Sequence, residues 1–267
     1  MSMFKSITIG QYVPGDSLLH KLDARAKFIA LILLIITVFT IRSFTGYLVL
    51  AAVVFTLLKT SRLPLPYFFR GLRPVFYILM FTVIVHFFMT KGGQTWFRIG
   101  FLSIDSYGVY LGVFMALRII FLVVATSLLT LTTSPIALTD GLEYLMKPLK
   151  RIGVPSHEIA MMMTIALRFI PTLMEEAEKI MKAQMARGAD FESGNIFRRA
   201  KNMIPLLVPL FVSAFRRADD LAIAMESRCY RGGEGRTRLR ELSAAPRDYY
   251  AILLSALFLT TFILLKI

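Results

Sequence analysis

Apolar residues are concentrated in five runs that charged segments separate. The runs cover residues 28–41, 44–58, 75–89, 107–131 and 249–265. A helix that crosses a bilayer needs about 20 residues, so the fourth run is long enough by itself and the first three must extend into flanking residues or thin the membrane. One continuous helix over the first two runs would place Arg42, Ser43 and Gly46 near the middle of the membrane, so we predict a turn there. The pattern therefore predicts five membrane-spanning helices.

The segment between the fourth and fifth runs is charged but keeps apolar residues at helical spacing. Apolar positions recur in steps of three and four over residues 159–180 and again over 207–225, which predicts two long amphipathic helices. A shorter helix is predicted over residues 134–151. We expect Pro171 to bend the first long helix. The segment is thus predicted to hold three helices.

Basic residues are unevenly distributed about these predicted spans. With five spans, the N-terminal segment, the loop after the second run and residues 132–247 share one side, and the last of these contains 18 Lys and Arg residues. Only Arg42, Lys91 and Arg98 lie between spans on the other side. Because Lys and Arg are enriched on the cytoplasmic side of membrane proteins, we predict a cytoplasmic N-terminus and a C-terminus outside.

Together these observations predict an all-α, polytopic membrane protein in three parts. Residues 1–131 form a membrane region with four spans, residues 132–246 form a cytoplasmic domain, and residues 247–267 form the last span. Hydrophobic residues make up 56% of the 267 residues, which is more than a soluble domain carries. The net charge of +14 follows from the membrane topology, so nucleic acid is not an expected partner.

The sequence lacks the motifs that are typical of several kinds of enzyme and metal site. The single cysteine, Cys229, excludes an internal disulfide and cysteine-based zinc sites. The sequence has no phosphate-binding loop of the Gly-x-x-x-x-Gly-Lys-Ser/Thr type, no His-Glu-x-x-His and no Gly-x-Ser-x-Gly. We therefore expect no enzymatic activity and no cofactor or metal in this chain, and any energy that it uses must come from another protein.

The two long amphipathic helices end in similar motifs that lie 41 residues apart. Ala183-Gln184-Met185-Ala186-Arg187-Gly188 aligns with Ala224-Met225-Glu226-Ser227-Arg228-Cys229. One interpretation is structural, because an Arg in the last turn complements the helix dipole and Gly188 is an ordinary left-handed cap. Cys229 is a less natural cap. The other interpretation is that both Arg residues contact a soluble partner with two similar parts.

Polar residues near and within the spans also have two interpretations. The cluster of His20, Asp23, Arg25 and Lys27 precedes the first span; such residues either set topology and touch anionic headgroups or make a specific contact with the cytoplasmic domain. Arg118 lies near the middle of the fourth span and must face protein or water there.

Small residues form a stripe on the fourth predicted span. Gly108, Gly112 and Ala116 recur every four residues, a spacing that permits close helix approach. Packing within the chain is one use, and contact with a partner membrane subunit is the other.

The chain resembles a known family over nearly its whole length. The N-terminal segment Gly10-x-Tyr12-x-Pro14-Gly15-Asp16-Ser17 with His20-Lys21-Leu22-Asp23-Ala24-Arg25-x-Lys27, the five spans and the two Arg motifs resemble the EcfT family, which includes CbiQ-like and BioN-like proteins. These are the transmembrane coupling components of energy-coupling factor importers for vitamins and transition metals. The resemblance implies a multi-pass protein of the prokaryotic cell (inner) membrane, without cofactors of its own.

The resemblance also implies partners and site residues. The two long helices would cross in a coupling domain, and their ends would dock into two ABC-type ATPase subunits that bind the ATP. The docking residues would be Ala186, Arg187 and Gly188 at one end and Ser227, Arg228 and Cys229 at the other. A separate substrate-binding membrane subunit would carry the cargo, which this chain therefore does not reveal. The alternative is a stand-alone polytopic transporter or a lipid-modifying membrane enzyme.

Overall fold

The computed structural model describes residues 12–99, 102–191, 195–233 and 244–265, which divide into two compact units. The first, here called the membrane unit, contains the described residues of Gly10–Gly141 and Glu241–Ile267. The second, here called the insert unit, is Leu142–Arg240. The division falls after the first turns of helix α5 (Pro135–Met146), somewhat later than the boundary expected at residue 132.

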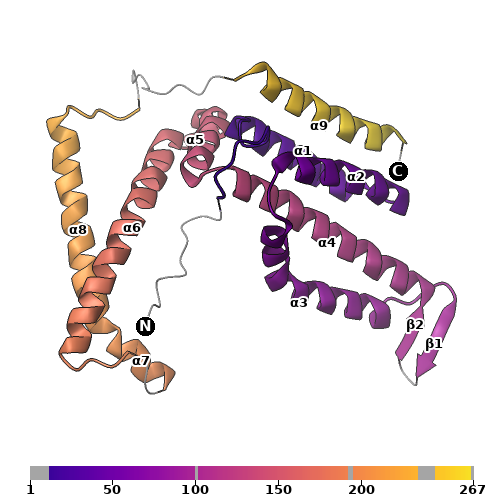
Figure 1. The fold of residues 1–267 in the computed structure, drawn as a ribbon, viewed down its shortest axis with the longest axis horizontal. Coiled ribbons are helices and arrows are strands. Elements are labelled where there is room, and N and C mark those ends of the chain that lie inside the picture. The colour runs from indigo at the N-terminus through magenta and orange to yellow at the C-terminus, as the bar shows by residue number, and fades with distance from the viewer. Residues whose placement is uncertain (1–11, 100–101, 192–194, 234–243, 266–267) are drawn as a thin grey trace. The chain divides into compact units, whose positions relative to one another are not determined.

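The membrane unit is built from helices whose apolar residues face one another. They are α1 (Ala24–Thr40), α2 (Phe44–Ser61), α3 (Leu65–Met89), α4 (Ser106–Thr132) and α9 (Pro246–Leu265). Among the described residues, α2, α3, α4 and α9 are long and apolar enough to cross a membrane. With 17 residues α1 is shorter than these four, and it packs against α4 and α9 (Figure 1). All five predicted spans are therefore helices, and the predicted turn separates α1 from α2.

Helix α3 begins well before the apolar run that predicted it. It starts at Leu65, next to Pro64 and Pro66, and continues through Pro74, whereas the apolar run begins at residue 75. The helix thus extends into flanking residues, as this short run required, and the added turns contain Arg70 and Arg73, which hide a helix from a hydrophobicity pattern. Proline at the first helical positions favours such a start, since its fixed φ angle suits the helix and its missing N–H has no intrahelical acceptor there.

A small β-hairpin joins α3 to α4 and was not predicted. Strand β1 (Thr95–Ile99) pairs antiparallel with β2 (Leu102–Asp105), with an irregularity between Thr95 and Phe97. Asp105 closes the base of the hairpin, because its carboxylate accepts a hydrogen bond of 2.8 Å from the N–H of Gly92. Strands this short give little alternation in sequence, so the all-α class holds except for this hairpin.

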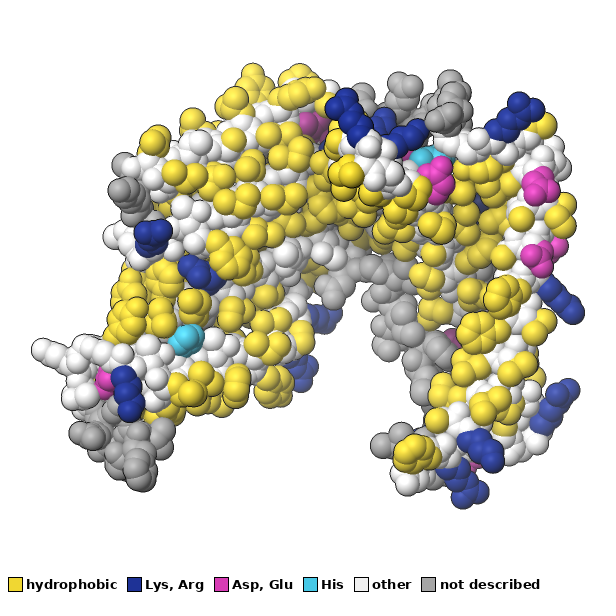
Figure 2. Space-filling view, turned by 180° about the vertical axis from the view of Figure 1, so that it is seen from behind, with side chains coloured by type: hydrophobic (Ala, Val, Ile, Leu, Met, Phe, Trp, Pro, Cys, Tyr) yellow, Lys and Arg dark blue, Asp and Glu magenta, His cyan; other side chains and the backbone are white. Residues whose placement is uncertain are grey.

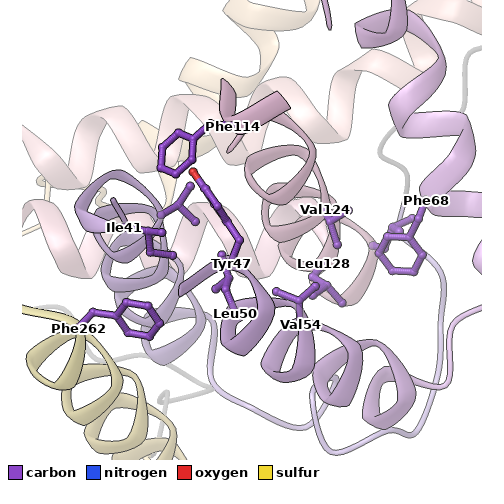
Figure 3. Packing of buried hydrophobic residues seen from close by; sticks show 11 residues of the cluster. Ile41, Tyr47, Leu50, Val54, Phe68, Phe114, Val124, Leu128 and Phe262 are labelled. Atoms are coloured by element: carbon purple, nitrogen blue, oxygen red, sulfur yellow. The ribbon is translucent and has the colours of Figure 1, made fainter. Parts of the chain in front are cut away.

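The core of the membrane unit lies where α1, α2 and α4 meet, with α9 alongside. Figure 3 shows Tyr47 of α2 with its ring toward Phe114 of α4, and the two ring centroids are 4.8 Å apart. Leu50 and Val54 continue the same face of α2, and Phe262 adds a contribution from α9. These residues come from three helices far apart in sequence, α2, α4 and α9, so their burial fixes the arrangement of these helices.

The insert unit contains the two predicted long helices and one further short helix. After α5, the 3-10 helix η1 (Lys147–Ile152) leads to α6 (Ser156–Ala186), and α7 (Ile196–Asn202) leads to α8 (Ile204–Ser227). The short helix predicted over residues 134–151 is thus α5 followed by η1. Helix α6 runs through Pro171 without interruption. The sequence did not indicate α7.

Candidate docking tips of the insert unit

Helices α6 and α8 contact each other through a polar contact at their crossing. Ser213 of α8 donates a hydrogen bond to Oε1 of Glu176 on α6, and Nη2 of Arg217 lies 3.1 Å from Oε2 of the same carboxylate. These two partners, with the Ser213 hydrogen bond first, hold the pKa of Glu176 below its usual range. One carboxylate therefore joins the two helices at a defined point.

The C-terminal ends of α6 and α8 lie on opposite sides of this crossing (Figure 1). Arg187 follows Glu176 by eleven residues, and Arg228 follows Arg217 by eleven. At 1.5 Å per residue, each Arg is roughly 16 Å along its helix from the contact. The two motifs are thus placed at similar distances from one shared contact, and we call them the first tip (residues 184–189) and the second tip (residues 225–230).

The backbone of the first tip closes helix α6 without help from side chains. The N–H of Gly188 donates to the carbonyl of Met185 at 3.0 Å, and the N–H of Ala189 donates to the carbonyl of Gln184 at 2.9 Å. Gly188 has a left-handed φ of 85°. This pair of bonds is the Schellman arrangement, in which the chain reverses after the last helical turn. Arg187 is the capping residue that precedes the reversal.

The second tip has the same backbone with different side chains. The N–H of Cys229 donates to the carbonyl of Glu226 at 2.9 Å, and the N–H of Tyr230 donates to the carbonyl of Met225 at 3.0 Å. Cys229 takes a φ of 58°, one of two positive values among the described non-glycine residues. A side chain in this region costs about 1 to 2 kcal/mol. Cys229 therefore occupies the position of Gly188 at an energetic cost.

The two Arg residues have nearly identical backbone angles, with φ and ψ of −90° and 9° at Arg187 and of −91° and 13° at Arg228. Because backbone N–H groups already occupy two of the terminal carbonyls at each tip, neither guanidinium is needed to make those bonds. Both Arg side chains belong to exposed residues. The arrangement can therefore present two guanidinium groups to acidic or carbonyl-lined surfaces.

All six residues that the sequence proposed for docking are exposed. They are Ala186, Arg187, Gly188, Ser227, Arg228 and Cys229. A Cβ added at Gly188 would have no heavy atom within 4 Å, so the first tip has open space around it. Whether these residues contact a partner stays a prediction.

The chain after the second tip packs back onto the start of α6. A Cβ on Gly233 would lie 2.5 Å from Cδ2 of His157, so only a glycine fits this approach. His157 in turn places Nδ1 3.1 Å from Oε1 of the buried Glu143. No sequence pattern indicated His157 or Glu143, and the glycine pair at 232–233 was the visible feature of this segment.

Apolar side chains remain exposed along both long helices, as Figure 2 shows over this part of the molecule. On α8, exposed residues include Val208 (56%), Phe211 (62%), Phe215 (66%) and Ile223 (64%). On α6, Met162 is 59% exposed. A surface with this many large apolar side chains is typical of a protein or membrane contact.

The small-residue stripe of α4 packs against α3. A Cβ on Gly108 would lie 2.7 Å from the carbonyl oxygen of His86 and 2.8 Å from that of Thr90, and one on Gly112 would lie 2.8 Å from Cε1 of Phe87. Both glycines are buried and Ala116 is half-buried. The two glycines thus permit close packing of α4 against α3 within the chain. Because they are buried, their exposure does not support contact of the stripe with a membrane partner.

Arg118 faces protein. Its Nε donates to the hydroxyl of Tyr47 at 3.3 Å, and its Nη2 donates to the carbonyl of Ile41 at 3.4 Å. The rings of Phe39 and Phe114 each have their centroid 5.3 Å from its Cζ. Because Ile41 follows the end of α1, the guanidinium provides a hydrogen-bond donor for a carbonyl at that helix terminus. The faces of the two aromatic rings cover the guanidinium.

The N-terminal cluster joins elements of the membrane unit. Nζ of Lys27 donates to the carbonyl of Thr132 at 2.9 Å and to Oγ1 of Thr133 at 3.2 Å. The N–H of Asp23 donates to Oδ1 of Asp248 at 2.8 Å. Lys27 is buried, so it does not reach lipid headgroups, and its contacts lie at the end of α4. Thr132 and Thr133 begin the segment that was predicted to be the cytoplasmic domain, but they lie in the membrane unit here, so a contact of the cluster with the insert unit stays a prediction.

No group of three or more His, Cys, Asp or Glu side chains that could hold a metal ion occurs among the residues that the structure describes. Nothing in this geometry tests for a cofactor. The expectation that the chain has none of its own stays a prediction.

Comparison with known proteins identifies the family. The family model for the cobalt transport protein CbiQ matches residues 15–239. The chain is 55% identical to an energy-coupling factor transporter transmembrane protein EcfT of Clostridium kluyveri over 99% of its length and 98% of the relative. It is 57% identical to an EcfT protein of Thermosediminibacter oceani, with 95% of each chain covered, and 50% identical to that of Bacillus subtilis over 92% and 93%. These relatives and the helical membrane architecture agree with one another, and the chain belongs to the EcfT family of energy-coupling factor transporter transmembrane proteins.

Proposed function

We propose that this chain is a non-enzymatic coupling subunit that transmits ATP-driven motion of two ABC-type ATPase subunits to a substrate-binding membrane subunit for uptake of a vitamin or transition metal. The observation that carries the proposal is the pair of exposed Arg tips with one backbone conformation on opposite sides of one helix crossing. Two equivalent contacts suit two similar ATPases. The ATP would be bound by those partners.

Each tip would place its Arg in an acidic or carbonyl-lined groove of one ATPase. Helix α6 has 31 residues and is therefore about 46 Å long, so it can carry a displacement at its end to distant parts of the insert unit. When the two ATPases approach or separate, the tips would follow, and the angle between α6 and α8 would change about the contact at Glu176. The crossing would act as the hinge of this movement.

The substrate-binding membrane subunit would contact the exposed apolar faces of α6 and α8. Large apolar side chains such as Phe211 and Phe215 would be covered by that partner. Replacing Phe215 by Ser should then reduce co-purification of the membrane subunit while the ATPases remain bound. Phe197 on α7, which is 86% exposed, offers a control, because its replacement by Ser should leave the subunit in place.

The positive-inside bias supports a cytoplasmic insert unit, which is where ATP and the ATPases are. The N-terminus would then be cytoplasmic and the C-terminus outside, in a multi-pass protein of the cell membrane. This orientation requires α1 to span the membrane together with the four longer helices.

The test replaces Arg187 and Arg228, singly and together, by Ala and by Lys. A charge-assisted hydrogen bond contributes roughly 1.5 to 3 kcal/mol, and an unpaired buried partner costs about 2 to 5 kcal/mol. Either Ala variant should weaken ATPase docking about tenfold or more. Lys should rescue it only partly, because Lys lacks the planar two-pronged donor. Docking is measured by co-purification of the ATPases and by transport.

Arg216 on α8 supplies the matched control, since it is exposed and lies outside both tips; Arg216→Ala should leave docking unchanged. Full activity with Lys at both tips, or undiminished docking with Ala at both, would show that Arg187 and Arg228 are ordinary helix-capping residues. A lone chain that transports substrate or modifies lipid without ATPases would instead support the stand-alone alternative.

A further inference from the structure

The membrane unit contains an apolar cavity of about 510 Å³, within the range of 300 to 1,000 Å³ that is typical of ligand pockets. Its walls are formed by α1, α2, α4 and α9. Small side chains create the space, because Ala26, Ala30, Ala125 and Ala251 line it where larger residues would fill it. Protein interiors are otherwise close-packed, so an apolar space of this size loses contacts unless something occupies it.

The cavity is elongated and follows the helix axes. It is lined on α4 from Ala125 to Thr132 and on α9 from Ala251 to Thr261, which corresponds to about two and three helical turns. Leu254 and Leu257 line it and are also 62% and 60% exposed. The cavity therefore reaches the surface of α9, a helix long and apolar enough to span the membrane. If α9 spans the membrane, that exposed apolar surface would face acyl chains.

One end of the cavity is polar. Lys27 and Thr132 line this end, next to the joint at which the N–H of Asp23 donates to Asp248. Oδ2 of Asp248 accepts a second hydrogen bond, from the N–H of Ala245 at 2.7 Å. Asp248 is buried, and its two oxygens are thus engaged by backbone groups.

Two exposed residues next to this end are basic. Lys21 precedes the cavity-lining Leu22, Arg247 lies one turn before Ala251, and both are exposed. Tyr249 and Tyr250 beside Arg247 are 66% and 67% exposed, and tyrosine is enriched at the level of lipid headgroups. An apolar slot with cations at its mouth is complementary to a molecule with one long apolar chain and an anionic head.

We propose that the cavity binds one acyl chain of an anionic glycerophospholipid from the cytoplasmic leaflet, with the phosphate near Lys21 and Arg247. The bound lipid would fill the space between α1 and α9 and so become part of the packing of the membrane unit. Apolar contact would hold the chain, and the two cations would favour an anionic over a zwitterionic headgroup by about fivefold each.

The test is native mass spectrometry of the full chain released from nanodiscs that contain phosphatidylglycerol and phosphatidylcholine in equal amounts. Wild type should retain one lipid, mainly phosphatidylglycerol. Ala251→Leu places extra bulk in the cavity and should reduce retention at least tenfold. Ala52→Leu makes the same change at an exposed position of α2 that does not line the cavity, and it should retain lipid as wild type does.

A second pair of changes separates the contribution of the lipid headgroup from that of the acyl chain. Lys21→Gln combined with Arg247→Gln should keep one lipid but remove the preference for phosphatidylglycerol. Circular dichroism melting of every variant distinguishes lost lipid from lost fold. Equal retention by wild type and Ala251→Leu, or the absence of retained lipid from folded wild type, would overturn the proposal; the cavity would then be closed by repacking or covered by a partner helix.

Discussion

The left-handed residue at each tip should decide how well that tip docks. Gly188→Ala tests this at the first tip, where φ is 85° and an added Cβ has no heavy atom within 4 Å. The change therefore introduces no clash. It alters only the cost of holding the left-handed conformation, which is about 1 to 2 kcal/mol for a residue with a side chain.

The cost of the left-handed conformation should lower the affinity of the tip for the ATPase. If docking requires the reversed chain after Arg187, a loss of 1 to 2 kcal/mol lowers affinity for the first ATPase about 5- to 30-fold. The second tip predicts the opposite change, because Cys229 already has a φ of 58°. Cys229→Gly removes the cost of the side chain but increases the flexibility of the unfolded chain. The gain in affinity for the second ATPase should therefore be at most about fivefold. Cys229→Ala should be nearly neutral.

The assay is titration of purified ATPase onto nanodisc-embedded chain, with Arg228→Ala present when the first tip is measured and Arg187→Ala when the second is measured. Gly153 offers a matched control, because its φ is 87° and the space around an added Cβ is equally open. Gly153→Ala should lower stability without lowering affinity. Unchanged affinity in Gly188→Ala, or an equal loss in Gly153→Ala, would refute the link between tip backbone and docking.

Three further predictions concern folding and topology. Gly108→Ala should lower the melting temperature, because the new Cβ meets backbone oxygens of α3 within 3 Å; an unchanged melting curve would contradict this packing. Because its pKa is lowered, Glu176 should stabilise the crossing above about pH 4 and lose that contribution as pH falls through its lowered pKa, and Glu176→Gln should flatten the acid side of the stability profile. A cysteine at Lys266 in a Cys229→Ser background should react with an impermeant reagent in intact cells; protection, with a reactive control cysteine at Lys91, would contradict the five-span topology.

Hydrophobic pattern was sufficient for the features that depend on local sequence. The apolar runs gave the membrane helices, because each run must be helical to satisfy its backbone in lipid. The tips were found because their similarity is visible in the chain itself, from Ala186 to Gly188 and from Ser227 to Cys229. The similarity of the two motifs did not predict that both tips share one backbone conformation, because cysteine does not normally take a left-handed φ as Cys229 does.

Features that depend on contacts between distant segments were not predictable. In the sequence, Lys27 looks like a residue that sets topology. In the structure, its Nζ donates to the carbonyl of Thr132, which is 105 residues later. The partners of Arg118 include the carbonyl of Ile41, which is 77 residues away. Hydrophobicity and spacing describe neighbours in the sequence, and both of these contacts arise only after α1 and α4 pack together.

The two tips share one backbone conformation, and contacts after the second tip explain how it tolerates Cys229 at the left-handed position. A strained residue persists when the surrounding structure fixes the chain on both sides of it. The second tip has such support, because Gly233 packs against His157 and His157 is joined to the buried Glu143. The chain after the first tip is also held, because Nδ2 of Asn202 donates to the carbonyl of Asp190 at 2.7 Å and Phe191 is buried. The two tips therefore differ in the left-handed residue itself: Gly188 takes its φ of 85° without a side-chain cost, whereas at Cys229 the contacts that follow α8 offset that cost.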